Sequence, residues 1–172
     1  VNRPRQLKAA IDAILALPWL AAAVRHTSIG VVGHSMGGYT ALALAGGHPR
    51  TVAREPHGPP PRSVDVEHDR RLGALVLLAP ATPWLMHEGA LADVRQAILM
   101  HVGGSDMVTP DDFHGKIVLD GVPDRHRVHA HVVPGAGHFS FLTPYPDSAR
   151  SPSLPPSIDP PGFDRPAYLA RL

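Results

Sequence analysis

The sequence predicts an α/β protein in which a mostly parallel sheet carries flanking helices. Apolar runs of strand length fall at 28–33, 73–79, 97–103 and 127–133, and helix-forming segments lie among them. Strands that alternate with helices are typical of a parallel sheet, because parallel neighbours need a crossover connection. The second run lies in LGALVLLAP, which is apolar on both sides of the strand alternation. That pattern predicts a strand covered on both faces.

Helical segments are predicted from periodicity and propensity. Residues 7–17 place Leu7, Ile11, Ile14 and Leu15 at helical spacing before Pro18 interrupts them. An Ala- and Leu-rich helix is expected directly after the glycine-flanked Ser35. Gly46, Gly47 and Pro49 are expected to end it. Shorter helices are expected at 89–94, within 111–122 and within 163–172.

The chain is predicted to form a single domain over 1–172. Residues 54–71 are proline-rich, charged and without periodicity, which predicts a surface loop, and residues 145–161 are predicted to be a proline-rich extended tail. The first segment has the pattern of an internal helix and only one strand precedes residue 35. We therefore expect 1–172 to be the C-terminal part of a larger domain whose N-terminal strands lie upstream.

Composition excludes several classes of function. The chain has 172 residues, a net charge of +1 and no cysteine. The absence of cysteine excludes disulfides, thiolate metal sites and a cysteine nucleophile. The near-neutral charge favours neither nucleic acid nor an anionic membrane as partner, and no apolar run is long enough to span a bilayer. Localisation and oligomeric state stay open; the cytoplasm is slightly favoured, although a signal upstream of Val1 would go unseen.

Residues 33–37 read Gly-His-Ser-Met-Gly, between a predicted strand and a predicted helix. This is the context of a nucleophile elbow, in which a sharp turn lifts a serine hydroxyl clear of the sheet. Side chains at Gly33 and Gly37 are expected to collide with the neighbouring strand and helix. We therefore predict Ser35 as a nucleophile and the backbone N–H of Met36 as an oxyanion donor. The alternative is a glycine-rich turn with a capping serine.

A serine nucleophile needs a general base and an acid that orients it. His138 lies in PGAGHFSFL after the last predicted strand, and Asp106 lies in HVGGSDMVTP after the preceding one. The chain order Ser, Asp, His after successive strands predicts a triad of Ser35, Asp106 and His138. Asp111 and Asp112 are rival acids, although their place after Pro110 is typical of a helix start.

The other histidines have ordinary explanations. His129 and His131 share one strand face, a spacing that suits a metal, but no third ligand is evident nearby, so no metal site is predicted. His57 and His68 belong to the polar loop and are expected to be solvated. His34 adjoins the serine and is expected to line the site without a chemical role.

These motifs resemble the α/β-hydrolase superfamily, and the resemblance implies a partial α/β-hydrolase fold whose N-terminal strands are missing from 1–172. GHSMGGYTALALAG is similar to its elbow, GGSDMVTP to its acid loop and GAGHFSFL to its histidine loop. The closing DPPGFDRPAY and the FSFL after the histidine resemble dienelactone-hydrolase-like and platelet-activating-factor-acetylhydrolase-like esterases, although cutinase-like polyester hydrolases also use GHSMGG. The superfamily takes a second oxyanion amide from a loop after its third strand. No HGG-type motif precedes Ser35.

The motifs and the resemblance together leave two functions open. The first is a serine hydrolase that cleaves small or medium carboxylic esters through an acyl-enzyme and needs no cofactor. The second is a non-catalytic fragment or subdomain of such a hydrolase that requires the upstream half or a partner to complete its sheet.

Overall fold

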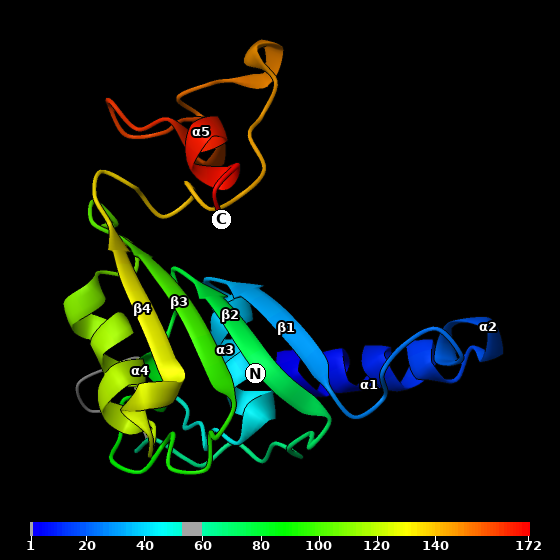
Figure 1. Ribbon diagram of the computed structural model, residues 1–172. Coiled ribbons are helices and arrows are strands. Elements are labelled where there is room, and N and C mark those ends of the chain that lie inside the picture. The colour runs from blue at the N-terminus through cyan, green and yellow to red at the C-terminus, as the bar shows by residue number, and fades with distance from the viewer. Residues whose placement is uncertain (1, 53–59) are drawn as a thin grey trace.

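The computed structural model describes residues 2–52 and 60–172. These residues contain one sheet of four parallel strands in the order β1-β2-β3-β4 (Figure 1). The strands are β1 (Ile29–His34), β2 (Leu72–Leu78), β3 (Ala97–Gly103) and β4 (Val128–Val133). The predicted parallel sheet with flanking helices is therefore confirmed. Because all four strands are parallel, their carboxyl ends lie at one edge of the sheet.

The helices differ in part from those expected. α1 (Arg3–Leu15) and α2 (Pro18–Ala21) precede β1, α3 (Met36–Ala45) joins β1 to β2, and α4 (Gly115–Gly121) lies between β3 and β4. The helix expected at 89–94 is wrong: this stretch forms turns, with amide-to-carbonyl hydrogen bonds from Ala92 to Gly89 and from Val94 to Leu91. Short 3-10 turns occur at Pro83–Leu85, Asp111–Phe113, Arg125–Arg127, Asp147–Ala149 and Pro155–Ser157.

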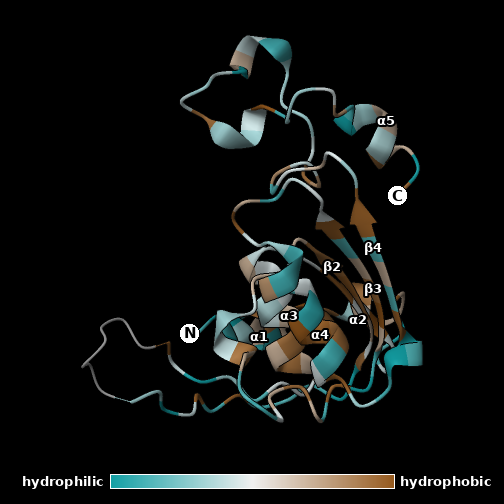
Figure 2. Ribbon diagram, turned by 90° about the vertical axis from the view of Figure 1, so that its left-hand side faces the viewer, coloured by the Kyte–Doolittle hydropathy of each residue, from teal (hydrophilic) through white to brown (hydrophobic). Residues whose placement is uncertain are grey.

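The core lies between the sheet and α3. α1, α3 and α4 lie on the same face of the sheet (Figures 1 and 2), and α3 is buried from Gly38 to Ala45. Its Leu42 and Leu44 pack with Leu75 of β2 and Met100 of β3 in one apolar cluster. Burying each such side chain contributes about 1.5–3 kcal/mol. This layer holds β1 and α3, and hence the turn between them, in a fixed position.

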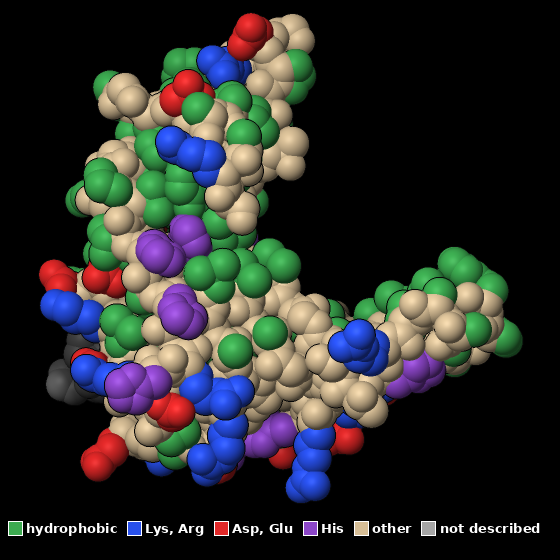
Figure 3. Space-filling view, viewed as in Figure 1, with side chains coloured by type: hydrophobic (Ala, Val, Ile, Leu, Met, Phe, Trp, Pro, Cys, Tyr) green, Lys and Arg blue, Asp and Glu red, His purple; other side chains and the backbone are tan. Residues whose placement is uncertain are grey.

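The opposite face of the sheet is open over its middle. Val32 pairs with Val76, which pairs with Leu99, so these apolar side chains share that face. Val32 is 69% exposed, and the space-filling view looks onto this face (Figure 3). The expectation that β2 is covered on both faces is wrong within the described residues, because Gly73 and Ala74 are exposed and Val76 is only half-buried. Apolar residues on both sides of a strand indicate that each face of the sheet can be covered, but the described helices α1, α3 and α4 cover only one face.

The C-terminal segment lies beyond the carboxyl ends of the strands (Figure 1). Residues 145–161, expected to be extended, contain two of the 3-10 turns, and α5 (Arg165–Leu169) follows. Phe163 and Tyr168 pack against a second apolar cluster that includes Leu78, Val133 and Phe141. The C-terminal segment is therefore part of the wall around the carboxyl edge of the sheet.

Of the loop expected at 54–71, residues up to 59 lie outside the described residues. The described part, 60–71, is mostly exposed and forms one isolated bridge between Arg50 and Ser63. Among the described helices, none combines the length and apolar character that crossing a bilayer requires.

Candidate active site

Ser35 occupies a strained turn between β1 and α3. Its φ of 53° and ψ of −116° lie where side chains are rarely found, as expected of a nucleophile elbow. The amide of Ser35 donates to the carbonyl of Leu78, and the amide of Ala81 donates to the carbonyl of Ser35, each at 2.9 Å. These two bonds fix the turn against the end of β2.

The glycines of the motif have different steric roles. A Cβ at Gly33 would lie 2.4 Å from the carbonyl of Gly37, and a Cβ at Gly38 would lie 2.7 Å from the side chain of Pro80. The expectation that Gly37 also avoids a collision is wrong, since a Cβ there meets nothing within 4 Å. Gly33 and Gly38 therefore allow the tight approach of strand, helix and neighbouring loop.

His138 faces Ser35 from the loop after β4. The Nε2 atom of His138 lies 3.0 Å from the Oγ of Ser35, and its Nδ1 lies 2.9 Å from the Oδ2 of Asp106. An ionised carboxylate only accepts hydrogen bonds, so Nδ1 of neutral His138 carries the proton and donates it. The Nε2 atom is then free to accept the hydroxyl proton of Ser35. His138 is 7% exposed, which shields this arrangement from water.

Asp106 is held as an anion by hydrogen bonds. Its Oδ1 accepts from the amides of Val108 and Thr109 at 2.7 and 2.8 Å, and its Oδ2 accepts from the Thr109 hydroxyl at 2.8 Å as well as from His138. Burial alone would raise the pKa of Asp106. The hydrogen bonds from His138, Thr109 and Val108 outweigh burial and lower its pKa to about 2. Asp106 is therefore ionised at neutral pH, although it is only 4% exposed.

Two adjacent loops bring Asp106 and His138 together. The amide of Gly104 donates to the carbonyl of Val133, and the amide of Ser105 donates to that of Ala136, each at 2.9 Å. A Cβ at Gly103 would lie 2.5 Å from the carbonyl oxygen of Ala136, so only glycine permits this approach. The loops after β3 and β4 are thus joined directly before Asp106 and His138.

The rival acids are directed elsewhere. Asp112 pairs with Lys116 one helical turn away, and both Asp111 and Asp112 lie in a 3-10 turn that leads into α4. Asp106, and neither of these, contacts His138 among the described residues. His68 bonds the carbonyl of Gly47, and His57 lies outside the described residues.

Sequence reasoning missed the role of Thr109. Its Oγ1 lies 2.8 Å from the Oδ2 of Asp106, 3.1 Å from the Nδ1 of His138 and 3.2 Å from the carbonyl of Ala79. Thr109 therefore links the acid, the base and the loop after β2. The spacing Asp106-x-x-Thr109 is a signal that was available, because an aspartate commonly bonds backbone amides two or three residues on.

His34 also contributes more than lining. Its Nε2 donates to the carbonyl of His138 at 2.7 Å, and the two rings lie 4.8 Å apart. Burial lowers the pKa of His34. The residue before Ser35 thereby ties the histidine loop to the elbow.

The amide of Met36 is suited to meet a negative charge beside Ser35. It belongs to the first residue of α3, where an amide has no partner within the helix, whereas the amides of Gly38 and Tyr39 donate to the carbonyl of Ser35. The positive end of the helix dipole lies at the same place. Within 2–52 and 60–172, no three His, Asp or Glu side chains gather in a group able to hold a metal ion.

Comparisons with known proteins address the fold. No protein-family model matches the sequence, and no curated protein matches it. Among solved structures, a protein of unknown function from Agrobacterium tumefaciens, provisionally assigned as an α/β hydrolase, is similar over 78% of this chain, with 18% identity and a TM-score of 0.51. The chain has part of the α/β-hydrolase fold.

A predicted CIB-like hydrolase from Thermoplasma acidophilum is also similar, over 77% of this chain, with 21% identity and a TM-score of 0.46. The chain spans about half the length of each of these two structures, since each match covers 50% of the solved chain. Within the α/β-hydrolase fold, the described strands carry Ser35, Asp106 and His138 at their carboxyl ends, the edge at which open α/β sheets bind ligands.

Proposed function

We propose that the protein is a serine hydrolase that cleaves carboxylic esters, with Ser35 as nucleophile, His138 as general base and Asp106 as the acid that orients it. The observation that carries the proposal is the pair of contacts at His138: 3.0 Å from Nε2 to the Ser35 hydroxyl and 2.9 Å from Nδ1 to Asp106. A serine hydroxyl is barely nucleophilic at neutral pH unless a base within this distance removes its proton.

The reaction proceeds in two halves. The Oγ of Ser35 attacks the ester carbonyl while Nε2 of His138 takes its proton, and the imidazolium formed is stabilised by the carboxylate of Asp106. The Met36 amide donates to the oxyanion of the tetrahedral intermediate. Collapse of that intermediate expels the alcohol, which receives the proton from His138, and leaves an acyl group on Ser35. A water molecule, deprotonated by His138, then attacks the acyl-enzyme; the acyl–Oγ bond breaks, the acid leaves, and His138 returns the proton to the Oγ of Ser35.

Small or medium esters are the proposed substrates, and the mechanism needs no cofactor. The resemblance of the FSFL and DPPGFDRPAY stretches to dienelactone-hydrolase-like and platelet-activating-factor-acetylhydrolase-like esterases favours this class. Removal of one oxyanion donor typically costs about 10²–10³ in turnover, so the rate depends on whether a second amide joins that of Met36.

The test is the substitution Ser35→Ala, assayed with p-nitrophenyl butyrate. Loss of hydrolysis to the background rate is expected, with Ser148→Ala, at an exposed serine of the C-terminal segment, as the matched control that keeps full activity. Equal activity of Ser35→Ala and the unaltered chain would refute the proposal.

The open sheet face, where Val32 is 69% exposed, is the observation that favours the alternative, a non-catalytic fragment or subdomain. Size-exclusion chromatography with circular dichroism, followed by labelling with a fluorophosphonate, separates the two. A folded chain that labels at Ser35 supports the hydrolase; a folded or aggregated chain that does not label favours the alternative.

A further inference from the structure

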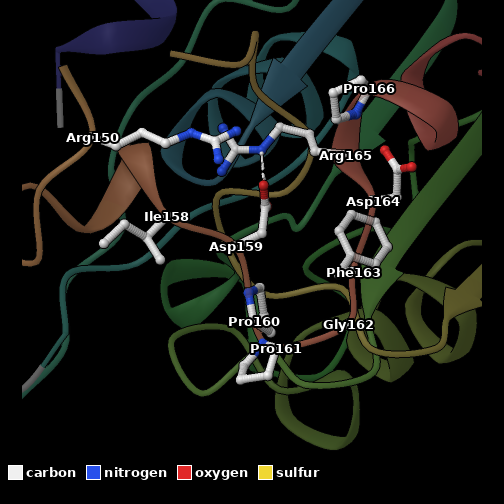
Figure 4. A pocket seen from close by; sticks show the side chains of 10 residues that line it. All are labelled: Arg150, Ile158, Asp159, Pro160, Pro161, Gly162, Phe163, Asp164, Arg165 and Pro166. Atoms are coloured by element: carbon white, nitrogen blue, oxygen red, sulfur yellow. Dashed lines mark hydrogen bonds and ion pairs between the residues drawn. The ribbon is translucent and has the colours of Figure 1, made fainter. Parts of the chain in front are cut away.

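A cavity lies in the C-terminal segment. Its volume is about 540 Å³, and Ser35 is not part of its wall. Figure 4 shows two arginines extending toward each other across this cavity, with apolar side chains around them. The residues that matter here are Arg150, Ile158, Asp159, Pro160, Phe163 and Arg165.

Arg165 is a buried cation with one unused end. It is 1% exposed; its Nε donates to both carboxylate oxygens of Asp159 at 2.9 Å, and its Nη1 donates to the carbonyl of Pro156 at 3.0 Å. Its Nη2 is buried and has no hydrogen-bond partner among the described residues. A buried N–H group without an acceptor is costly and rare in folded proteins.

Arg150 adds a second positive charge to the same cavity. Its side chain is 49% exposed, and its only ion pair among the described residues is a 3.4 Å contact with the exposed Asp147. Exposed pairs of this kind contribute little. Both arginines line the cavity, so an additional acceptor placed between them would be stabilised.

The acids of the cavity are already engaged. Asp159 binds Arg165 and accepts from the Ser140 hydroxyl, and Asp164 caps α5 by accepting from the amide of Ala167. Neither carboxylate accepts a hydrogen bond from the Nη2 of Arg165. Within the described residues, this nitrogen therefore has a free donor for an added acceptor.

We propose that this cavity binds a small organic carboxylate between Arg150 and Arg165. A guanidinium presents paired N–H groups that match a carboxylate, and a charge-assisted bond to Nη2 would satisfy the unused donor. Because Nη2 is covered, binding requires a side chain of the cavity wall to move, and in this proposal it is the half-exposed Arg150 that does so. Phe163, Ile158 and Pro160 offer an apolar surface, which favours an anion with a hydrocarbon body over inorganic phosphate.

The cavity adjoins the loop of His138 without being part of the candidate active site. The Ser140 hydroxyl links Asp159 to the amide of Gly137, with both bonds at 3.0 Å, and a Cβ at Gly137 would lie 2.9 Å from Pro160. Binding of the carboxylate does not depend on hydrolysis, so the proposal can be tested apart from the proposed function.

Isothermal titration calorimetry of the full chain at pH 7 and low ionic strength tests the proposal, with benzoate, acetate and inorganic phosphate as separate probes. Saturable binding of benzoate at millimolar concentration is expected, about tenfold tighter than acetate because the ring is buried against Phe163. Arg150→Gln should weaken benzoate binding about tenfold, since one charge-assisted bond is lost.

Arg95→Gln is the matched control, because Arg95 is exposed, lies outside the cavity and, among the residues that the structure describes, forms an ion pair only with Asp93. Circular dichroism checks that each variant is folded. The proposal is overturned if benzoate gives no saturable heat up to about 20 mM, or if Arg150→Gln binds it as tightly as the unaltered chain. Tighter binding of phosphate than of benzoate would refute the assignment of an organic carboxylate.

Discussion

Replacing Asp106 with asparagine separates the shape of the candidate active site from its charge. The amide oxygen of asparagine can still accept from the amides of Val108 and Thr109, as Oδ1 does now. The amide nitrogen then lies where Oδ2 accepts from Thr109 and from Nδ1 of His138. That nitrogen donates, so Nδ1 must accept, and the proton of neutral His138 moves to Nε2, which faces Ser35.

The expected loss of folding stability follows from the lowered pKa of Asp106. The hydrogen bonds that lower it from the ordinary 3.8 to about 2 also stabilise the folded chain at neutral pH, by about 2 kcal/mol. The neutral amide would lose that contribution, so Asp106→Asn is expected to reduce the free energy of unfolding by about 2 kcal/mol. Because Nε2 can no longer take the proton of Ser35, kcat/KM should fall by about 10³–10⁴.

The assay pairs hydrolysis of p-nitrophenyl butyrate with urea unfolding at pH 7. Asp112→Asn is the control, because Asp112 is an exposed acid paired with Lys116 and its loss should leave the urea midpoint almost unchanged. If Asp106→Asn kept kcat/KM within about threefold of the unaltered chain, the proposed role of Asp106 would be wrong.

Three further predictions test the same geometry. Gly33→Ala should destabilise the chain by about 3 kcal/mol or prevent folding, because its Cβ would lie 2.4 Å from a backbone carbonyl. Gly37→Ala, whose Cβ meets nothing within 4 Å, should unfold at an equal or higher urea concentration, because alanine favours the helix by up to about 1 kcal/mol. Thr109→Val should lower kcat/KM by about tenfold and the free energy of unfolding by about 1–2 kcal/mol, because Asp106 loses the hydroxyl donor of Thr109. A loss of stability with full activity would contradict the place of Thr109 in the site. Acid unfolding should show the lowered pKa of Asp106: its stabilisation is present above about pH 4 and lost as the pH falls toward about 2, and urea midpoints for Asp106→Asn should lack this slope.

The layout of the sheet was predictable because buried strands and helices leave strong patterns. Apolar runs bounded by glycine and proline place all four strands within a residue or so of their observed ends. The stretch from Gly89 to Val94 shows where this fails: its residues bury Ala90, Leu91 and Val94, yet they do so through turns. Burial alone does not distinguish a short helix from a chain of turns, since six residues are too few for a period to show.

Steric and hydrogen-bond detail was less accessible from the sequence. Gly33 and Gly37 are equivalent in the motif, but only the structure shows that one approaches a carbonyl and the other faces open space. Thr109 reads as an ordinary residue before a proline, and its contacts with His138 and Ala79 join loops that follow three different strands. Such contacts depend on how far each loop extends beyond its strand, a property that a local pattern does not carry.

The choice of Asp106 over Asp111 and Asp112 follows from that extension. β3 and β4 are parallel neighbours, and Gly103 pairs with Val133 at their carboxyl ends. The first residues of the two loops that follow these strands therefore run side by side. Asp106 lies three residues past this pair, within the stretch where the two loops are hydrogen-bonded, and His138 lies five residues past it. By residue 111 the chain has turned toward α4, on the covered face of the sheet. An acid that is to contact a base on the neighbouring loop must therefore come before the chain leaves the strand edge, which makes distance from the strand end, and not the type of acid, the deciding variable.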